Sequence, residues 1–149
     1  MSDITIRPLT AADRDGWWRL FEQYVHFYRT SLTDAVAEAA FDRLTGPISN
    51  MQGLVAVDAN GTAVGIANLV FHPSTWTSAQ VCYLEDLFVD PTVRGSGIAR
   101  ALINAIYDLA PRHGADRVYW HTQVYNAPAR ALYDTVAHNT SYAVYEHEL

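Results

Sequence analysis

Large hydrophobic side chains recur at helical spacing before residue 30 of this chain. They stand three or four positions apart, as on one face of a helix: Trp17, Leu20, Phe21, Tyr24 and Phe27. Thr10 followed by Asp13 has the spacing of a capping box, a common start of a helix. We therefore expect a helix that begins there and runs to about Arg29. A second helix is expected over about residues 34–44, where Gly46-Pro47 ends it.

The hydrophobic pattern changes to that of strands from residue 54 onward. Residues 54–58 and 63–72 predict two strands joined by a tight turn at Asn60-Gly61. Residues 81–89 predict a mostly apolar strand that one acidic pair interrupts. Further strands are expected near residues 4–7, 118–122 and 141–147, and further helices near residues 98–113 and 127–135.

This order of elements is that of a mixed α/β protein. A helix lies between the strands predicted near residues 85 and 120, and such a crossover joins parallel strands. No internal repeat, low-complexity tract or linker is visible, so we expect one domain over residues 1–149.

The charge balance is acidic. Ten basic and 16 acidic residues give a net charge of -6, which argues against nucleic-acid binding and favours cationic small molecules or cationic protein tails. All ten basic residues are Arg, and no Lys occurs. The chain therefore has no residue for Schiff-base chemistry, for a P-loop lysine or for a lysine general base.

Cysteine and histidine usage bears on location and metals. Cys82 is the one cysteine, so no intramolecular disulfide forms and a reducing compartment is expected. The first residues lack the basic flank and apolar core of a signal peptide, and no apolar run is long enough to span a membrane. We expect a soluble, cytoplasmic protein without a membrane partner. The six histidines are scattered, so no metal site is expected.

A glycine-rich loop, residues 94–100, lies between a predicted strand and a predicted helix. Gly95 and Gly97 permit a left-handed backbone and a close ligand, and the helix start offers free N–H groups to an anion. An ordinary strand-to-helix turn is the alternative. The absence of Lys excludes a P-loop, and a dinucleotide fingerprint needs a small residue where Arg100 stands.

Arg94, Gly97 and Ala99 have the spacing Arg/Gln-x-x-Gly-x-Gly/Ala of the pyrophosphate loop of N-acetyltransferases. With residues 83–91 before it, this loop resembles that of the GCN5-related N-acetyltransferase (GNAT) superfamily. Other segments are similar to its second cofactor motif (Asn126, Ala129, Leu132, Tyr133) and to its histone-and-polyamine acetyltransferase branch (residues 41–43, 72–76 and 118–120).

This resemblance implies a fold and a cosubstrate. The fold is a mixed, mostly antiparallel twisted sheet flanked by helices, with a splayed parallel strand pair that holds acetyl-CoA. The cofactor-binding residues that it implies are Leu87, Phe88, Val89, Arg94, Gly95, Ser96, Gly97, Ile98, Ala99, Arg100, Asn126 and Tyr133.

The resemblance also implies catalytic roles. Tyr133 matches the tyrosine that protonates the departing CoA thiolate, although an aromatic residue on an amphipathic helix is otherwise a core residue. Glu85 is the candidate base that takes a proton from the amine, directly or through water. Asp86 follows it on the strand, so only one of the two carboxylates should face the cleft unless a bulge intervenes.

For the acceptor site, the candidates are Glu22, Tyr24, Tyr28, Trp76, Glu85 and Asp86. Carboxylates and aromatic rings suit a cationic amine, whereas an exposed face of an amphipathic helix is the alternative for those on the first helix.

The hypothesis is direct acetyl transfer from acetyl-CoA to a primary amine of a small molecule such as a polyamine or amino acid, by a homodimer. A non-catalytic CoA-binding module and an acetyltransferase of a basic protein tail are the alternatives. Ala137-His138 stand where the superfamily commonly has Gly-Phe, which leaves the acyl-chain preference open.

Overall fold

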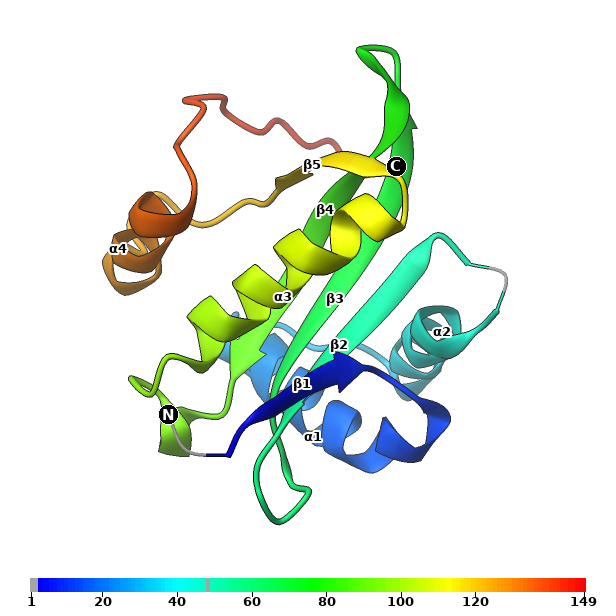
Figure 1. Ribbon diagram of the computed structural model, residues 1–149, viewed down its shortest axis with the longest axis vertical. Helices are drawn as coiled ribbons and strands as arrows, with labels where there is room; N and C mark the ends of the chain where they lie inside the picture. Colours follow the sequence, from blue (N-terminus) through cyan, green and yellow to red (C-terminus); the bar gives the residue numbers. More distant parts are fainter. Residues whose placement is uncertain (1–2, 48) are drawn as a thin grey trace.

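The central sheet sets the frame of the molecule in the computed structural model, which describes residues 3–47 and 49–149 (Figure 1). Over these residues the strands are β1 (Thr5–Pro8), β2 (Met51–Val57), β3 (Ala63–Ser74), β4 (Thr77–Val89) and β5 (Ala115–Tyr119). They lie in the order β1-β2-β3-β4-β5. The first four strands are antiparallel, and β4 and β5 are parallel, as the predicted crossover requires.

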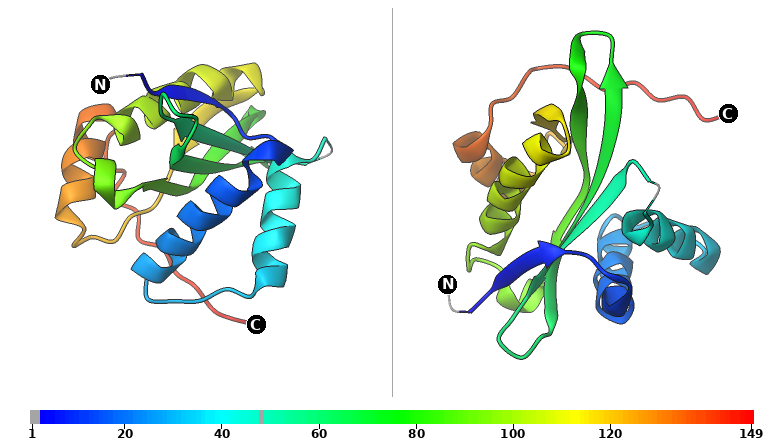
Figure 2. Two further views of the ribbon diagram at one scale, coloured as in Figure 1. Left: turned by 90° about the horizontal axis from the view of Figure 1, so that it is seen from below. Right: turned by 45° about the vertical axis from the view of Figure 1, so that its right-hand side comes forward.

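Helices cover both faces of this sheet. They are α1 (Arg14–Phe27), α2 (Asp34–Thr45), α3 (Ile98–Arg112) and α4 (Ala127–Val136), with short 3-10 turns at η1 (Ala11–Asp13) and η2 (Pro91–Val93). Helices α1 and α2 lie on one face and α3 on the other, with α4 beside α3 (Figure 2). The molecule is thus a three-layer α/β arrangement whose middle layer is the sheet.

Two hydrophobic clusters hold the layers together. On the α1–α2 face, Trp17 is fully buried and stacks on Phe21 with ring centroids 4.6 Å apart. On the other face, Leu102 and Ile106 of α3 are fully buried against the sheet. Apolar residues at helical spacing therefore pack as the sequence pattern predicts.

Local signals place the first elements. The Asp13 carboxylate accepts hydrogen bonds from the Thr10 backbone N–H (2.8 Å) and hydroxyl (3.1 Å), so the predicted capping box is present. The turn between β2 and β3 contains Gly61, whose φ of 80° is left-handed and suits glycine. Both the first helix and the hairpin are confirmed.

The structure corrects two expectations near the C-terminus. The strand expected at residues 118–122 spans Ala115–Tyr119, because its pairing with β4 begins at Ala115 and ends at Tyr119. The prediction of a strand over residues 141–147 is wrong: this segment is extended and exposed, with no strand beside it among the described residues (Figure 1). An alternating pattern makes a strand only where another strand supplies the hydrogen-bonding ladder.

Among the described residues, none of the helices is long and apolar enough to cross a membrane.

Candidate active site

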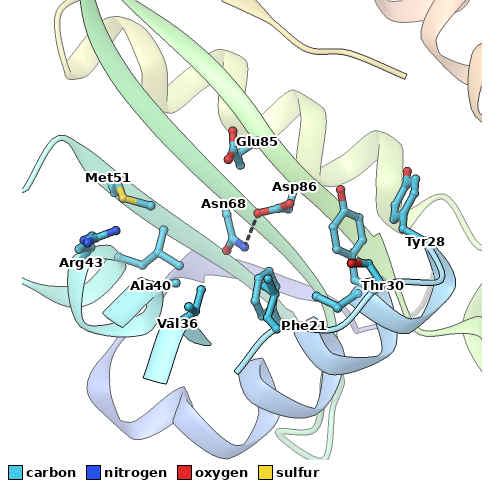
Figure 3. A pocket seen from close by; sticks show the side chains of 14 residues that line it. Phe21, Tyr28, Thr30, Val36, Ala40, Arg43, Met51, Asn68, Glu85 and Asp86 are labelled. Atoms are coloured by element: carbon cyan, nitrogen blue, oxygen red, sulfur yellow. Dashed lines mark hydrogen bonds between the residues drawn. The ribbon is translucent and has the colours of Figure 1, made fainter. Parts of the chain in front are cut away.

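Strand β4 has one residue more than β3 in the middle of the sheet. Asn68 of β3 pairs with Asp86, and Leu69 pairs with Leu84, so Glu85 between them has no partner on β3. Such an extra residue is a β-bulge, and it interrupts strict alternation. Glu85 and Asp86 consequently line the same pocket, which a regular strand would not allow (Figure 3).

Asp86 is held by a buried chain of hydrogen bonds. The Trp17 indole N–H donates to Asn68 Oδ1, and Asn68 Nδ2 donates to Asp86 Oδ2, both at 3.0 Å. Burial raises the pKa of Asp86, and hydrogen bonds from Asn68 and the Tyr24 hydroxyl partly offset that rise. The orientation of this carboxylate is therefore fixed from the core of the molecule.

Glu85 is more accessible than Asp86. Its pKa is raised, first because it is partly desolvated and second because Asp86 places a like charge beside it. A carboxylate whose pKa is raised is a stronger proton acceptor in its ionised form. Glu85 thus combines access to solvent with the electrostatics of a general base.

The pocket beneath these carboxylates has a volume of about 440 Å³. It lies between the sheet and helices α1 and α2, and Tyr24 and Tyr28 form part of its aromatic wall (Figure 3). The other lining residues are Phe21, Val25, Thr30, Leu32, Val36, Ala40, Arg43, Leu44, Met51 and Asn68. The structure therefore brings together four of the six predicted acceptor-site residues.

Two predicted acceptor-site residues lie elsewhere. Glu22 is on the exposed side of α1 and is not among the described residues that line the pocket. Trp76 is 91% exposed in the turn between β3 and β4. Glu22 lies on the side of α1 opposite the hydrophobic stripe that includes Phe21 and Tyr24, and we leave both Glu22 and Trp76 out of the site.

The parallel strands separate next to the bulge. Pairing between β4 and β5 ends at Tyr83 and Tyr119, and within the described residues Leu84 and residues 86–89 pair with β3 only. The backbone edge of this part of β4 therefore faces the gap toward β5 and α4, while Leu87 packs on the α3 side and Phe88 on the α1 side. A polar ligand arm can hydrogen-bond along such an edge.

Tyr133 of α4 lies across this gap. Its ring meets Trp120 edge-to-face at 5.3 Å, and its pKa is raised by burial and then by the nearby Tyr28. Tyr133 is not among the described residues that line the pocket, but Tyr28, whose charge acts on it, does line it. Asn126 is the N-cap residue of α4, and its side chain makes no capping hydrogen bond.

The glycine-rich loop leads directly into α3. Gly95 and Gly97 have φ angles of 82° and 84°, with open space where a Cβ would stand. No side chain caps α3, so the first N–H groups, of Ile98, Ala99 and Arg100, lack helical acceptors. These donors and the positive end of the helix dipole suit a phosphate group.

Arg94 braces this loop against the end of β4. Its Nε donates to the Val89 carbonyl at 3.1 Å, and its guanidinium lies 5.2 Å from the centroid of the Phe88 ring. The Ser96 hydroxyl donates to the Val93 carbonyl. These contacts fix the loop relative to the free edge of β4.

Sequence reasoning missed three polar residues of the pocket, Thr30, Arg43 and Asn68. Asn68 is 2% exposed and is a polar position in the otherwise apolar stretch from Ala63 to Leu69, a signal that was available. Arg43 belongs to a segment noted for its resemblance to known enzymes, but nothing in its spacing marked it as a pocket residue.

In the part of the chain that the structure describes, no group of three or more His, Cys, Asp or Glu side chains is placed to hold a metal ion.

Comparison with known proteins gives a consistent family. Residues 17–137 match the family model described as "Acetyltransferase (GNAT) family". The chain is 33% identical over 144 residues to the D-amino-acid N-acetyltransferase HPA3 of Saccharomyces cerevisiae, covering 96% of this chain and 89% of the relative. It is 30% identical over 132 residues to the uncharacterized N-acetyltransferase YhfO of Bacillus subtilis, covering 88% and 87%.

A solved structure confirms the predicted fold. AAC(6')-Iy in complex with the bisubstrate analog CoA-S-monomethyl-acetylneamine matches 99% of each chain with a TM-score of 0.86 at 21% identity. The likeness includes the mixed sheet with its antiparallel strands and one parallel pair.

Proposed function

This chain belongs to the GNAT family of N-acetyltransferases, and from that premise we propose that it moves an acetyl group from acetyl-CoA directly to a primary amine of a small molecule. The observation that carries the proposal is the bulge at Glu85. It puts two carboxylates into one pocket, beside the free edge of β4. The proposal treats residues 1–149 as one N-acetyltransferase domain.

Acetyl-CoA, the cosubstrate used by this family, fits the residues that the sequence singled out. The free edge at Leu87–Val89 would take the amide groups of its pantetheine arm, as an added strand would. The loop from Gly95 to Arg100 would take its pyrophosphate, because the open glycines and free N–H groups form an anion site. Asn126 and Tyr133 would contact it from α4. Bound acetyl-CoA supplies an activated thioester.

The proposed transfer balances in protons. The acceptor arrives as an ammonium ion and loses one proton to Glu85, directly or through water. The amine nitrogen then forms a bond to the acetyl carbon, the bond from that carbon to sulfur breaks, and Tyr133 protonates the leaving thiolate. The second proton of the nitrogen passes to the Tyr133 phenolate, directly or through water, which leaves a neutral amide and the CoA thiol, and Glu85 releases its proton to solvent. Burial raises the pKa of Tyr133, so its phenol holds its proton at neutral pH.

An acyl-enzyme route has no support at the one cysteine. Cys82 is fully buried, and burial raises the pKa of its thiol to about 12. A nucleophilic cysteine requires a thiolate and access to substrate. We therefore propose a single displacement without a covalent enzyme intermediate.

The pocket favours a small cationic acceptor. Glu85 and Asp86 attract an ammonium group, and the Tyr24 and Tyr28 rings add cation–π attraction. Among the relatives, one is named for D-amino acids and another for thialysine. A polyamine, an amino acid or a similar amine thus fits the proposal.

The deciding test is release of free thiol from acetyl-CoA with a panel of polyamines, L- and D-amino acids, aminoglycosides, arylalkylamines and a basic peptide. Turnover should fall ~10²–10⁴-fold with Glu85→Gln or Tyr133→Phe, the range for a lost general base or acid. Acetyl-CoA affinity should stay nearly unchanged, and Tyr125→Phe, an exposed tyrosine, should keep full turnover.

Each negative result has its own meaning. Unchanged turnover in Tyr133→Phe would refute its role as the acid. A panel on which no amine reacts, although acetyl-CoA binds, would favour a non-catalytic CoA-binding module. Reaction with the basic peptide alone would favour a protein acceptor.

We also propose a homodimer formed through the C-terminal segment. This segment, residues 137–149, is exposed throughout, and Tyr142 and Tyr145 are 88% and 95% exposed. Strand β5 is an edge strand of the sheet over the described residues. An extended, alternating segment can pair with such an edge in a second copy.

Light scattering after gel filtration tests this assembly. The full chain should have twice its mass of 16.6 kDa, and a chain ending at His138 should be monomeric. A monomeric full chain at all concentrations would contradict the proposed dimer.

A further inference from the structure

The acceptor pocket contains charges of both signs on different walls. Glu85 and Asp86 come from β4, whereas Arg43 comes from α2, which packs on β2 (Figure 3). In Figure 3, Arg43 lies beside Met51 of β2, with Asn68 of β3 between it and the carboxylates. This cation would repel the second ammonium group of a polyamine, because like charges repel.

Arg43 has no protein partner among the residues that the structure describes. Ion pairs there join Arg7 to Asp13, Arg14 to Glu38 and Arg19 to Asp90, but none includes Arg43. The guanidinium can therefore form a two-pronged pair with a carboxylate of a ligand. The Arg43 side chain is exposed to solvent. An acceptor that fills the pocket against its apolar wall would displace water from this pair and strengthen it.

The topology fixes the distance scale between the two charged ends. Arg43 reaches the pocket from α2, which packs on β2. Strands β2 and β4 are separated by β3, and two strand spacings amount to about 10 Å, which is the order of magnitude of the distance across the pocket. The α-amine and the carboxylate of an α-amino acid are joined through a single carbon and cannot span that length. A chain of four or five methylene groups can.

We propose that Arg43 is the carboxylate-binding residue of the acceptor site, and that the acceptor is an ω-amino carboxylate. Its amine lies at Glu85 and Asp86, and its carboxylate pairs with Arg43. The methylene chain between them packs against the apolar wall that includes Val36 and Ala40. This inference rests on the proposed acetyl transfer and adds the acceptor's second functional group.

Matched acceptors test the inference. The kcat/KM for 6-aminohexanoate should exceed that for hexylamine by about 10-fold or more, because a charge-assisted hydrogen bond is worth about that factor. It should also exceed the values for glycine, which is too short, and for 1,6-diaminohexane, which has a cation at the second end.

Variants of Arg43 test whether the preference for a carboxylate depends on this side chain. Arg43→Gln should lower kcat/KM for 6-aminohexanoate about 10- to 100-fold, mainly through KM, and leave hexylamine unchanged. Arg43→Lys should recover part of the loss, because it restores charge without the planar fork. Arg112→Gln, which makes the same change of net charge at the exposed end of α3, should have no effect.

A binding measurement separates this inference from catalysis. Hexanoate, which has no amine to acetylate, should bind the wild-type protein in a calorimetric titration and lose about 10-fold or more in affinity with Arg43→Gln. Equal effects of Arg43→Gln on 6-aminohexanoate and hexylamine, or unchanged hexanoate binding, would overturn the role of Arg43. Failure of every amine to react would instead overturn the proposed acetyl transfer. Hexanoate binding would then still test whether Arg43 binds a carboxylate.

Discussion

Asn68 connects the core of the protein to its candidate catalytic carboxylates, so replacing it should affect both stability and charge. The residue is 2% exposed, and its amide accepts from Trp17 and donates to Asp86. Asn68→Ala removes both hydrogen bonds. The fully buried indole N–H of Trp17 then has no acceptor in this arrangement, and Asp86 loses a donor that stabilises its ionised form.

The expected cost follows from these two losses. A buried donor left without a partner costs about 1–3 kcal/mol, and a hydrogen bond to a charged group is worth about 1.5–3 kcal/mol. We expect Asn68→Ala to lower the free energy of unfolding by about 3–5 kcal/mol at pH 7. For a chain of this size each kcal/mol shifts Tm by about 2–4 °C, so Tm should fall by roughly 6–20 °C.

A double-mutant cycle with Trp17→Phe separates the two losses. In the Trp17→Phe background the indole N–H is gone, so Asn68→Ala should cost about 1–2 kcal/mol less than in the wild-type protein. Urea denaturation followed by circular dichroism gives the four free energies. At pH 4 the cost should be smaller than at pH 7, because Asp86, whose folded-state pKa is already raised, is then more often neutral.

Two outcomes would refute this reasoning. The first is additivity of the two substitutions within about 0.5 kcal/mol, which would mean that Trp17 and Asn68 are not energetically coupled. The second is a cost of Asn68→Ala that increases as the pH falls, which would mean that the amide does not stabilise an ionised Asp86.

Three further predictions concern the cap of the first helix, the glycine loop and the acidic pair. Since its ion pair and capping bonds lower the folded-state pKa of Asp13 to about 2, Asp13→Asn should cost about 1–2 kcal/mol at pH 7. About half of that difference should be gone at pH 3 in thermal denaturation, because the stabilisation disappears as pH falls through the folded pKa. Gly97→Ala should raise the KM for acetyl-CoA about 10-fold or more, because it strains the left-handed backbone and places a methyl group in the open space proposed for the pyrophosphate. Gly61→Ala, at a similar positive φ in the β2–β3 turn, should cost similar stability without changing KM. Asp86→Asn removes the like charge beside Glu85 and should lower the pKa of Glu85, so the acid limb of the kcat/KM profile should move to lower pH; a limb that stays in place would contradict this coupling.

The bulge in β4 could be predicted from the spacing of hydrophobic residues in the sequence. Cys82, Leu84 and Leu87 all pack on the α3 side of the sheet. The first two are two residues apart, as alternation requires, but Leu84 and Leu87 are three apart, which requires one extra residue between them. That shift of period was visible in the sequence as a sign that Glu85 and Asp86 do not simply alternate.

Other parts of the site could not be obtained from local patterns. Tyr28, at the C-terminal end of α1, and Tyr133 of α4 influence each other electrostatically although they are more than 100 positions apart in the chain, and no local spacing in the sequence predicts this proximity. In the sequence, Arg43 is one charged residue of an amphipathic helix, and only the packing of the sheet and helices shows that it lines the pocket. The alternation of residues 141–147 predicted a strand that the structure does not form, because alternation does not show whether a partner strand is there to pair with it.

The extra residue of β4 has a consequence for how this protein could lose its activity over evolutionary time. Loss of the Glu85 codon alone would restore regular alternation, with Leu84 and Leu87 still facing α3 and Asp86 still opposite Asn68. Most one-residue deletions within a strand turn every later side chain to the wrong face. This deletion would leave the side chains of both hydrophobic clusters on their own faces of the sheet. A single in-frame deletion would thus yield a folded protein that keeps the glycine-rich loop but lacks the proposed base, and a gene copy carrying it could persist as a binding protein rather than decay.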